Sequence, residues 1–143
     1  MKKIICIIAV VLMIASVVYA QKKMAIAAKD LPGMKGMWSG TINFGVFEGG
    51  GSSACTLEIL SDATPVKAKL TIKDISQPVA SAFGLTAGQN VMESSDGALT
   101  SQGTIFFTGP EKNFLEITKT GDKKVSLYYF FRGLRGDGSL SKK

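Results

Sequence analysis

The chain has 143 residues, with 17 basic and 11 acidic side chains, a formal net charge of +6 and no histidine. Without histidine it lacks the commonest general base and metal ligand near neutral pH, so Ser–His and Cys–His catalysis and the usual zinc sites are excluded. The basic residues are spread along the sequence instead of forming one stripe, which argues against nucleic-acid binding. We therefore expect no enzymatic activity, no cofactor and no metal site.

Residues 1–20 have the three parts of a secretory signal peptide. Two lysines follow Met1, an uncharged apolar run begins at Ile4, and small residues end at Ala20. This order predicts export and cleavage after Ala20, so that the protein acts in the periplasm or outside the cell without a stable membrane span. An uncleaved anchor is the alternative, because the run from Ile4 to Ala20 approaches the roughly 20 residues that a spanning helix needs.

Residues 21–35 are predicted to form a lead-in segment before the domain at 36–143. Met24–Ala28 is compatible with a helical turn, which Leu31-Pro32-Gly33 would end, since proline and glycine together mark a turn. From Gly36 the period of the apolar residues changes to two, which is typical of a half-buried strand.

The domain has this two-residue rhythm in most of its segments. Three strands are predicted at 36–46, 55–59 and 66–73, with a glycine-rich loop at 48–53 and a turn at 61–65 between them. After an irregular segment at 74–90, further strands are predicted at 91–94, 99–108, 113–119, 124–132 and 133–140, and Ser95-Asp96-Gly97 is predicted as a turn.

The irregular segment has two interpretations. Pro78 suits the first turn of a short helix that would run through Phe83 and stop at Gly84. Ile75–Val79 is equally compatible with an edge strand.

These elements predict an all-β fold. Seven or eight short strands joined by tight turns favour a single antiparallel up-and-down barrel, whose closure removes exposed strand edges. The predicted mature chain has one cysteine, Cys55, so no intrachain disulfide can form, and this residue is expected to be a small buried hydrophobe.

Gly36-Met37-Trp38, at the opening of the first strand, resembles the G-x-W motif of lipocalins and related calycin barrels. The resemblance implies that Trp38 packs across the barrel floor and that a basic side chain from near the end of the last strand covers it. Arg132 or Arg135 is expected in that role, because a guanidinium on an indole face gains cation–π attraction. The chain is also similar in size and build to small exported bacterial barrels that inhibit metalloproteases and lysozymes.

The segment 124–132 carries aromatic side chains on both of its faces. Tyr129 and Phe131 share one face, and Tyr128 and Phe130 share the other. One face of an exposed strand is normally polar, so some outward aromatic surface must be covered by the 74–90 segment, by another copy of the chain, or by a ligand or partner.

Together these features predict a non-catalytic binding protein of the cell envelope or exterior. If it holds an apolar ligand, the expected pocket residues are Trp38, Phe44, Phe107, Tyr129 and Phe131. If it presents loops to a protein partner, 47–53 and 84–90 are the expected rim. The alternatives are an exported inhibitor that inserts Met24–Met34 into a target cleft, and a structural envelope component. Paired carboxylates for glycoside hydrolysis are not expected, and Glu93 and the other glutamates are assigned to the solvated surface.

Overall fold

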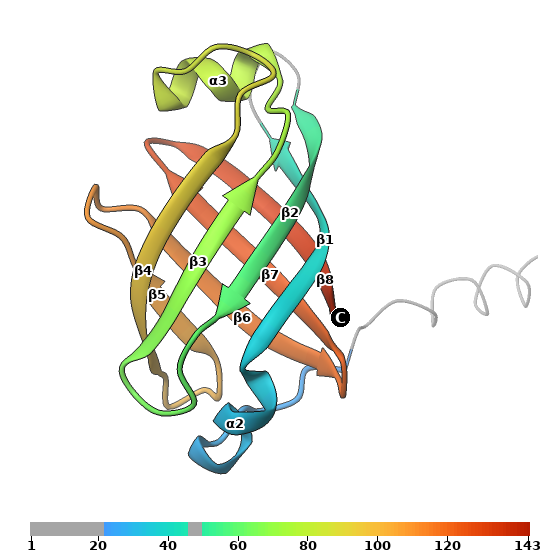
Figure 1. Ribbon diagram of the computed structural model, residues 1–143, viewed down its shortest axis with the longest axis vertical. Coiled ribbons are helices and arrows are strands. Elements are labelled where there is room, and N and C mark those ends of the chain that lie inside the picture. Colours follow the sequence, from blue (N-terminus) through green and yellow to red (C-terminus); the bar gives the residue numbers. More distant parts are fainter. Residues whose placement is uncertain (1–21, 46–49) are drawn as a thin grey trace, which may run out of the picture.

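The computed structural model describes residues 22–45 and 50–143, so the predicted signal peptide at 1–20 lies outside the described residues. Eight antiparallel strands form a closed barrel in which each strand pairs with the next and β8 pairs with β1 (Figure 1). The strands are β1 (Gly36–Gly45), β2 (Gly51–Ile59), β3 (Val66–Ile72), β4 (Val91–Leu99), β5 (Ile105–Thr108), β6 (Phe114–Gly121), β7 (Lys124–Phe131) and β8 (Leu134–Lys142). The predicted up-and-down barrel is confirmed.

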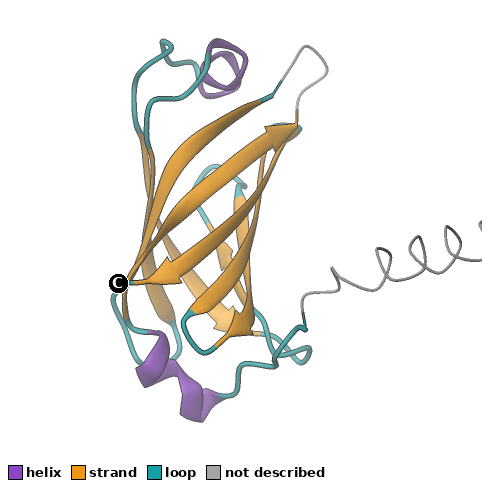
Figure 2. Ribbon diagram, turned by 90° about the vertical axis from the view of Figure 1, so that its right-hand side faces the viewer, coloured by secondary structure: helices purple, strands orange, loops and turns teal. Residues whose placement is uncertain are grey.

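Short helices lie at both ends of the barrel (Figure 2). The 3-10 turn η1 (Ala28–Asp30) and the helix α2 (Leu31–Met34) lie at one end. Leu31-Pro32-Gly33 was expected to end a helix, but it forms α2 itself, because proline is tolerated in the first helical turn, where its missing N–H needs no partner.

The helix α3 (Gln77–Phe83) lies at the other end of the barrel. Of the two interpretations of the irregular segment, the short helix is confirmed and the edge strand is wrong. The helix ends at Gly84, whose φ of 67° is in the left-handed region that glycine adopts without steric cost.

Three strand boundaries differ from the prediction by more than two residues, and one of them is the start of β5, which begins at Ile105 and not at the predicted residue 99. β4 runs straight through Ser95-Asp96-Gly97, so the turn predicted there is wrong and the strand continues to Leu99. The glycine has a packing role instead, because a Cβ at position 97 would lie 2.5 Å from a ring carbon of Phe107. β2 begins at Gly51, earlier than predicted, and residues 48–49 of the loop predicted at 48–53 lie outside the described residues.

Side chains alternate between the interior and the outer wall along the strands, as the two-residue period predicts. The buried side chains of β7 are Val125, Leu127, Tyr129 and Phe131. Cys55 is also buried, and burial raises the pKa of its thiol to about 12, so it packs as a small hydrophobe as predicted. An eight-stranded barrel is just wide enough for side chains to fill it.

Trp38 lies at the α2 end of the barrel and is fully buried. Its indole Nε1 donates a 2.8 Å hydrogen bond to the carbonyl of Met34, at the end of α2. The ammonium of Lys142 lies 5.7 Å from the ring centroid and donates to the carbonyl of Gly33 at 2.5 Å. The cover over the tryptophan is therefore Lys142, and the prediction of Arg132 or Arg135 is wrong.

The strand ends explain this correction. Arg132 and Gly133 have φ values of 47° and 84° and form the tight turn between β7 and β8, at the α3 end of the barrel. Arg135 is exposed near the start of β8. The last strand returns to the α2 end, where Lys142 pairs in register with Trp38.

The outward aromatic side chains form a row across β5, β6 and β7. The Phe114 ring stacks on Phe106 at 5.4 Å and on Phe130 at 5.1 Å, and it lies 5.9 Å from Tyr128. The 74–90 segment does not cover this row, so that interpretation is wrong. Instead Phe83 of α3 stacks on Phe131 at 4.9 Å, on the inward face of β7.

Candidate functional site

The five side chains predicted to line an apolar pocket all point into the barrel, where they are tightly packed. Their exposed fractions are 0% for Trp38, Phe107 and Tyr129, 3% for Phe131 and 4% for Phe44. A void large enough for water would give the side chains around it accessible surface, so the space beside these residues is filled. An apolar ligand among them would have to displace core side chains.

The barrel wall has an opening at its α3 end. β4 pairs with β3 from Val91 to Gly97 but with β5 only from Asp96 onward, because β5 ends at Thr108. Within the described part of the chain, the start of β4 therefore has a free edge. The connection between β5 and β6, residues 109–113, forms the other side of the opening.

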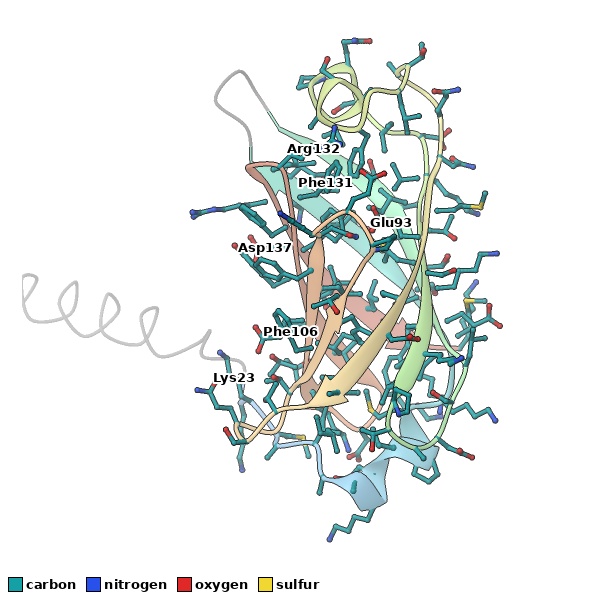
Figure 3. All side chains as sticks on the ribbon, turned by 90° about the vertical axis from the view of Figure 1, so that its left-hand side faces the viewer. Lys23, Glu93, Phe106, Phe131, Arg132 and Asp137 are labelled. Carbon is teal, nitrogen blue, oxygen red and sulfur yellow. The ribbon has the colours of Figure 1, made fainter. Side chains whose placement is uncertain are left out.

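A cleft of about 520 Å³ occupies this opening, which is within the roughly 300–1,000 Å³ typical of small-molecule sites. Its apolar lining includes Phe83, Leu85, Met92 and Phe131. Its polar lining includes Glu93, Glu111 and Asn113. Figure 3 shows Glu93, Phe131 and Arg132 near one another at the α3 end of the molecule. Of the five predicted pocket residues, Phe131 is the one that lines this cleft.

The connection between β5 and β6 places Asn113 in the cleft. The backbone N–H of Gly109 donates to the carbonyl of Asn113 at 2.9 Å and closes the loop, in which Lys112 has a φ of 59°. A Cβ at position 109 would lie 2.0 Å from Oδ1 of Asn113, so only glycine leaves room for the amide. The loop thus holds the side chain of Asn113 against β4, where the residue is only 5% exposed.

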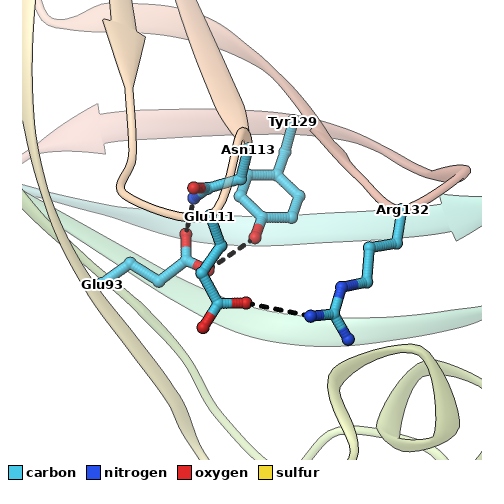
Figure 4. A network of polar contacts seen from close by, with 5 residues as sticks. All are labelled: Glu93, Glu111, Asn113, Tyr129 and Arg132. Carbon is cyan, nitrogen blue, oxygen red and sulfur yellow. Dashed lines mark hydrogen bonds and ion pairs between the residues drawn. The ribbon is translucent and has the colours of Figure 1, made fainter.

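Glu93 is the centre of a polar network in the cleft (Figure 4). Its Oε1 accepts a 2.8 Å hydrogen bond from the hydroxyl of Tyr129, and its Oε2 accepts a 2.5 Å hydrogen bond from Nδ2 of Asn113. The Oδ1 of Asn113 is buried and has no hydrogen-bond partner in the described part of the chain. The network therefore joins β4, β7 and the β5–β6 connection and retains a free buried acceptor.

Burial changes the acidity of both ionisable members of this network. It raises the pKa of Glu93 above its ordinary 4.5, and the negative charge of Glu111 adds to this, while hydrogen bonds from Tyr129 and Asn113 act in the opposite direction. Burial likewise raises the pKa of Tyr129, helped by the nearby carboxylate of Glu93. Within this pair the phenol therefore acts as the hydrogen-bond donor, and Glu93 is the group that ionises first.

Glu111 has its own positive partner. Arg132 lies 3.3 Å from its carboxylate, and both side chains are well exposed, so the pair contributes little to stability. The same guanidinium lies 4.9 Å from the centroid of the Phe131 ring. Arg132, which was expected over the barrel floor, thus forms part of the rim of the cleft.

A larger groove of about 630 Å³ lies on the outer wall. It is lined mainly by polar residues, among them Lys23, Gln102, Glu116 and Asp137. Its half-buried acid, Glu116, accepts one side-chain hydrogen bond, from the hydroxyl of Thr104 at 2.8 Å, whereas Glu93 accepts two and lies beside apolar walls. We therefore regard the cleft at the α3 end as the candidate functional site.

Sequence reasoning missed the central residue of this site. Glu93 is expected on the solvated surface, but it shares the inward face of β4 with Val91 and Gly97, and it remains partly exposed because β5 is too short to cover this part of the strand. The available signal was Tyr129, because an inward tyrosine needs a hydrogen-bond partner for its hydroxyl.

Among residues 22–45 and 50–143, no group of three or more Cys, Asp or Glu side chains is placed to hold a metal ion. In the same ranges no helix is long and apolar enough to cross a membrane. Compared with models of known protein families and with curated proteins, the chain matches neither a family model nor a curated sequence.

Proposed function

We propose that this protein is an exported, non-catalytic binding protein that takes a small, largely apolar ligand into the cleft at the α3 end of its barrel. One observation carries the proposal. The barrel interior is filled, and at this end the wall opens into a cleft with aromatic and aliphatic walls contributed by Phe83, Leu85 and Phe131. Concave, mainly apolar sites with a few placed polar groups are the usual form of a small-molecule site.

Two features of the sequence support the non-catalytic and exported parts of the proposal. The chain has no histidine, which removes the usual nucleophile–base pairs. Residues 1–20 have the order of charge, apolar run and small residues that is typical of a cleaved secretory signal.

The floor of the barrel supports the resemblance to lipocalins, and with it the proposal of a binding protein. Gly36-Met37-Trp38 opens β1, and Trp38 lies under a basic side chain, as in the calycin arrangement, with Lys142 in place of an arginine. The proposed ligand site differs from the internal pocket predicted from the sequence, because here the ligand enters from the side of one barrel end.

The inhibitor alternative has less support. Its predicted inserting segment, Met24–Met34, is fastened to the barrel by backbone hydrogen bonds from Met24 to Lys119 and from Ile26 to Gly103. The side chains of Ile26 and Leu31 are buried in the core. A segment that is hydrogen-bonded to the barrel and buried in its core is poorly suited to enter the cleft of another protein.

The proposal is tested by binding of the neutral hydrophobic dye Nile red to the mature protein. We expect saturable binding that is at least tenfold weaker in Phe83→Ser, which removes one wall of the cleft. Phe106→Ser is the matched control, because it removes a phenylalanine from the outer aromatic row, and it should leave the affinity unchanged. Absence of binding to the wild-type protein, or equal loss in both variants, would overturn the proposal.

A further inference from the structure

The charges that line the cleft are opposite in sign to those of the chain as a whole. The chain has a net charge of +6, yet the ionisable side chains that line the cleft are Glu93 and Glu111, without a lysine or arginine among the described lining residues. Arg132 pairs with Glu111 from the rim. Glu93 is thus left as the carboxylate without a cationic partner.

The free hydrogen-bonding capacity in the cleft is that of acceptors. Each carboxylate oxygen of Glu93 receives one donor and can accept a second, because each has two lone-pair directions. The Oδ1 of Asn113 also has no partner in the described part of the chain, but it is buried against Gly109, where an added Cβ would lie 2.0 Å from it, so the acceptors that a ligand can reach are those of Glu93. A ligand that matches this site brings donors.

We propose that the ligand of this cleft is an amphiphilic amine, whose ammonium group binds Glu93 and whose apolar part lies against Phe83 and Phe131. This inference rests on the proposed function above and adds the chemical class of the ligand. An ammonium group supplies three donors and the positive charge that a half-buried carboxylate lacks.

The apolar walls suit the rest of such a molecule. Phe83 and Phe131 lie nearly parallel, with an interplanar angle of 10° and centroids 4.9 Å apart, and Leu85 and Met92 extend the apolar surface. The exposed side chain of Met92 adapts readily to ligands of different shape because it is unbranched and flexible.

Three ligands that share one alkyl chain test the inference, namely dodecylamine, dodecanol and dodecanoate, each titrated calorimetrically into the mature protein below its micellar concentration. We expect the amine to bind at least tenfold more tightly than the alcohol, and the carboxylate to bind most weakly. Equal or tighter binding of the carboxylate would overturn the inference while leaving the proposed function intact. Absence of binding by all three would overturn the proposed function itself.

Two variants assign the preference to one side chain. Glu93→Gln should reduce the ratio of amine to alcohol affinity to about one. Glu116→Gln makes the same charge change in the polar groove of the outer wall, and it should keep the full ratio. A preference that survives Glu93→Gln, or that is lost in both variants, would contradict binding of the ammonium at Glu93.

The pH dependence gives a readout that a structural role of Glu93 would not produce. Amine binding should weaken as the pH falls through the raised pKa of Glu93, while alcohol binding to the same protein stays constant. The other ionisable groups that face this acid are Tyr129, Glu111 and the Arg132 paired with Glu111. Parallel loss of amine and alcohol binding would instead indicate that acid disrupts the cleft, and it would contradict the inference.

Discussion

The hydroxyl of Tyr129 donates a 2.8 Å hydrogen bond to Oε1 of Glu93 and so joins the inward face of β7 to the free edge of β4. Tyr129→Phe removes this donor and leaves a half-buried carboxylate oxygen with one fewer partner. We expect a loss of about 1–3 kcal/mol in the free energy of unfolding at pH 7, since an unsatisfied buried acceptor costs about this much. Urea unfolding of the mature protein measures it.

Tyr128→Phe is the control for this change. Its hydroxyl lies on the outer face of the same strand, beside the aromatic row, so its removal should alter the free energy of unfolding by less than about 0.5 kcal/mol. Equal effects of the two substitutions would show that the bond between Tyr129 and Glu93 does not stabilise the barrel.

The stability contributed by protonated Glu93 should depend on pH in a defined direction. Because burial raises its pKa in the folded state, this contribution is fully present below the ordinary value of 4.5 and is lost as the pH rises through the folded pKa. Glu93→Gln removes the titration, so the stability of the variant relative to the wild type should increase between pH 4 and pH 7. Urea unfolding across this range measures the difference.

The change of this stability difference with pH is the quantity that tests the prediction. Glu93→Gln also weakens the hydrogen bonds with Tyr129 and Asn113, but this loss of stability is the same at every pH. A flat difference for Glu93→Gln would mean that burial does not perturb this acid.

The barrel could be predicted from the sequence because its signal is local. In β3 and β7 every second side chain is apolar, and such a pattern fits one face of a pleated strand regardless of the partners. The ends of elements were less reliable. Ser95-Asp96-Gly97 has turn composition, but the contact between Gly97 and the ring of Phe107 is decided by packing between strands.

The cleft could not be predicted because it depends on register. Glu93 and Asn113 meet only because β5 stops at Thr108 and leaves the start of β4 uncovered. The end of a strand at Thr108 is predicted correctly, but the pairing that sets it opposite Asp96, and so leaves Glu93 uncovered, is not contained in the sequence near either residue. The prediction of the basic residue that covers Trp38 was wrong for a similar reason, since it depended on which residue ends the last strand.

Lys142 should stabilise the floor of the barrel through its contacts with Trp38 and the carbonyl of Gly33. Lys142→Met keeps the length of the side chain and removes the charge and the donor, so we expect a loss of about 1 kcal/mol and a shift of the tryptophan emission to longer wavelength. Arg132→Met, at the opposite end of the barrel, should leave the emission unchanged. An emission shift in the Arg132 variant alone would reverse the assignment of the cover.

The filled interior can be tested by adding a single methyl group. Gly97→Ala would place a Cβ 2.5–2.9 Å from three ring carbons of Phe107, and we expect it to cost about 1–3 kcal/mol of unfolding free energy, measured by urea unfolding. Gly33→Ala is the control, because no atom lies within 4 Å of the added Cβ, and it should be neutral or slightly stabilising. Combining Gly97→Ala with Phe107→Leu should cost less than the sum of the two single changes, since the smaller side chain makes room for the methyl group. If Gly97→Ala is as stable as the wild type, the space beside Phe107 is not filled, and the interior of the barrel again becomes a candidate pocket.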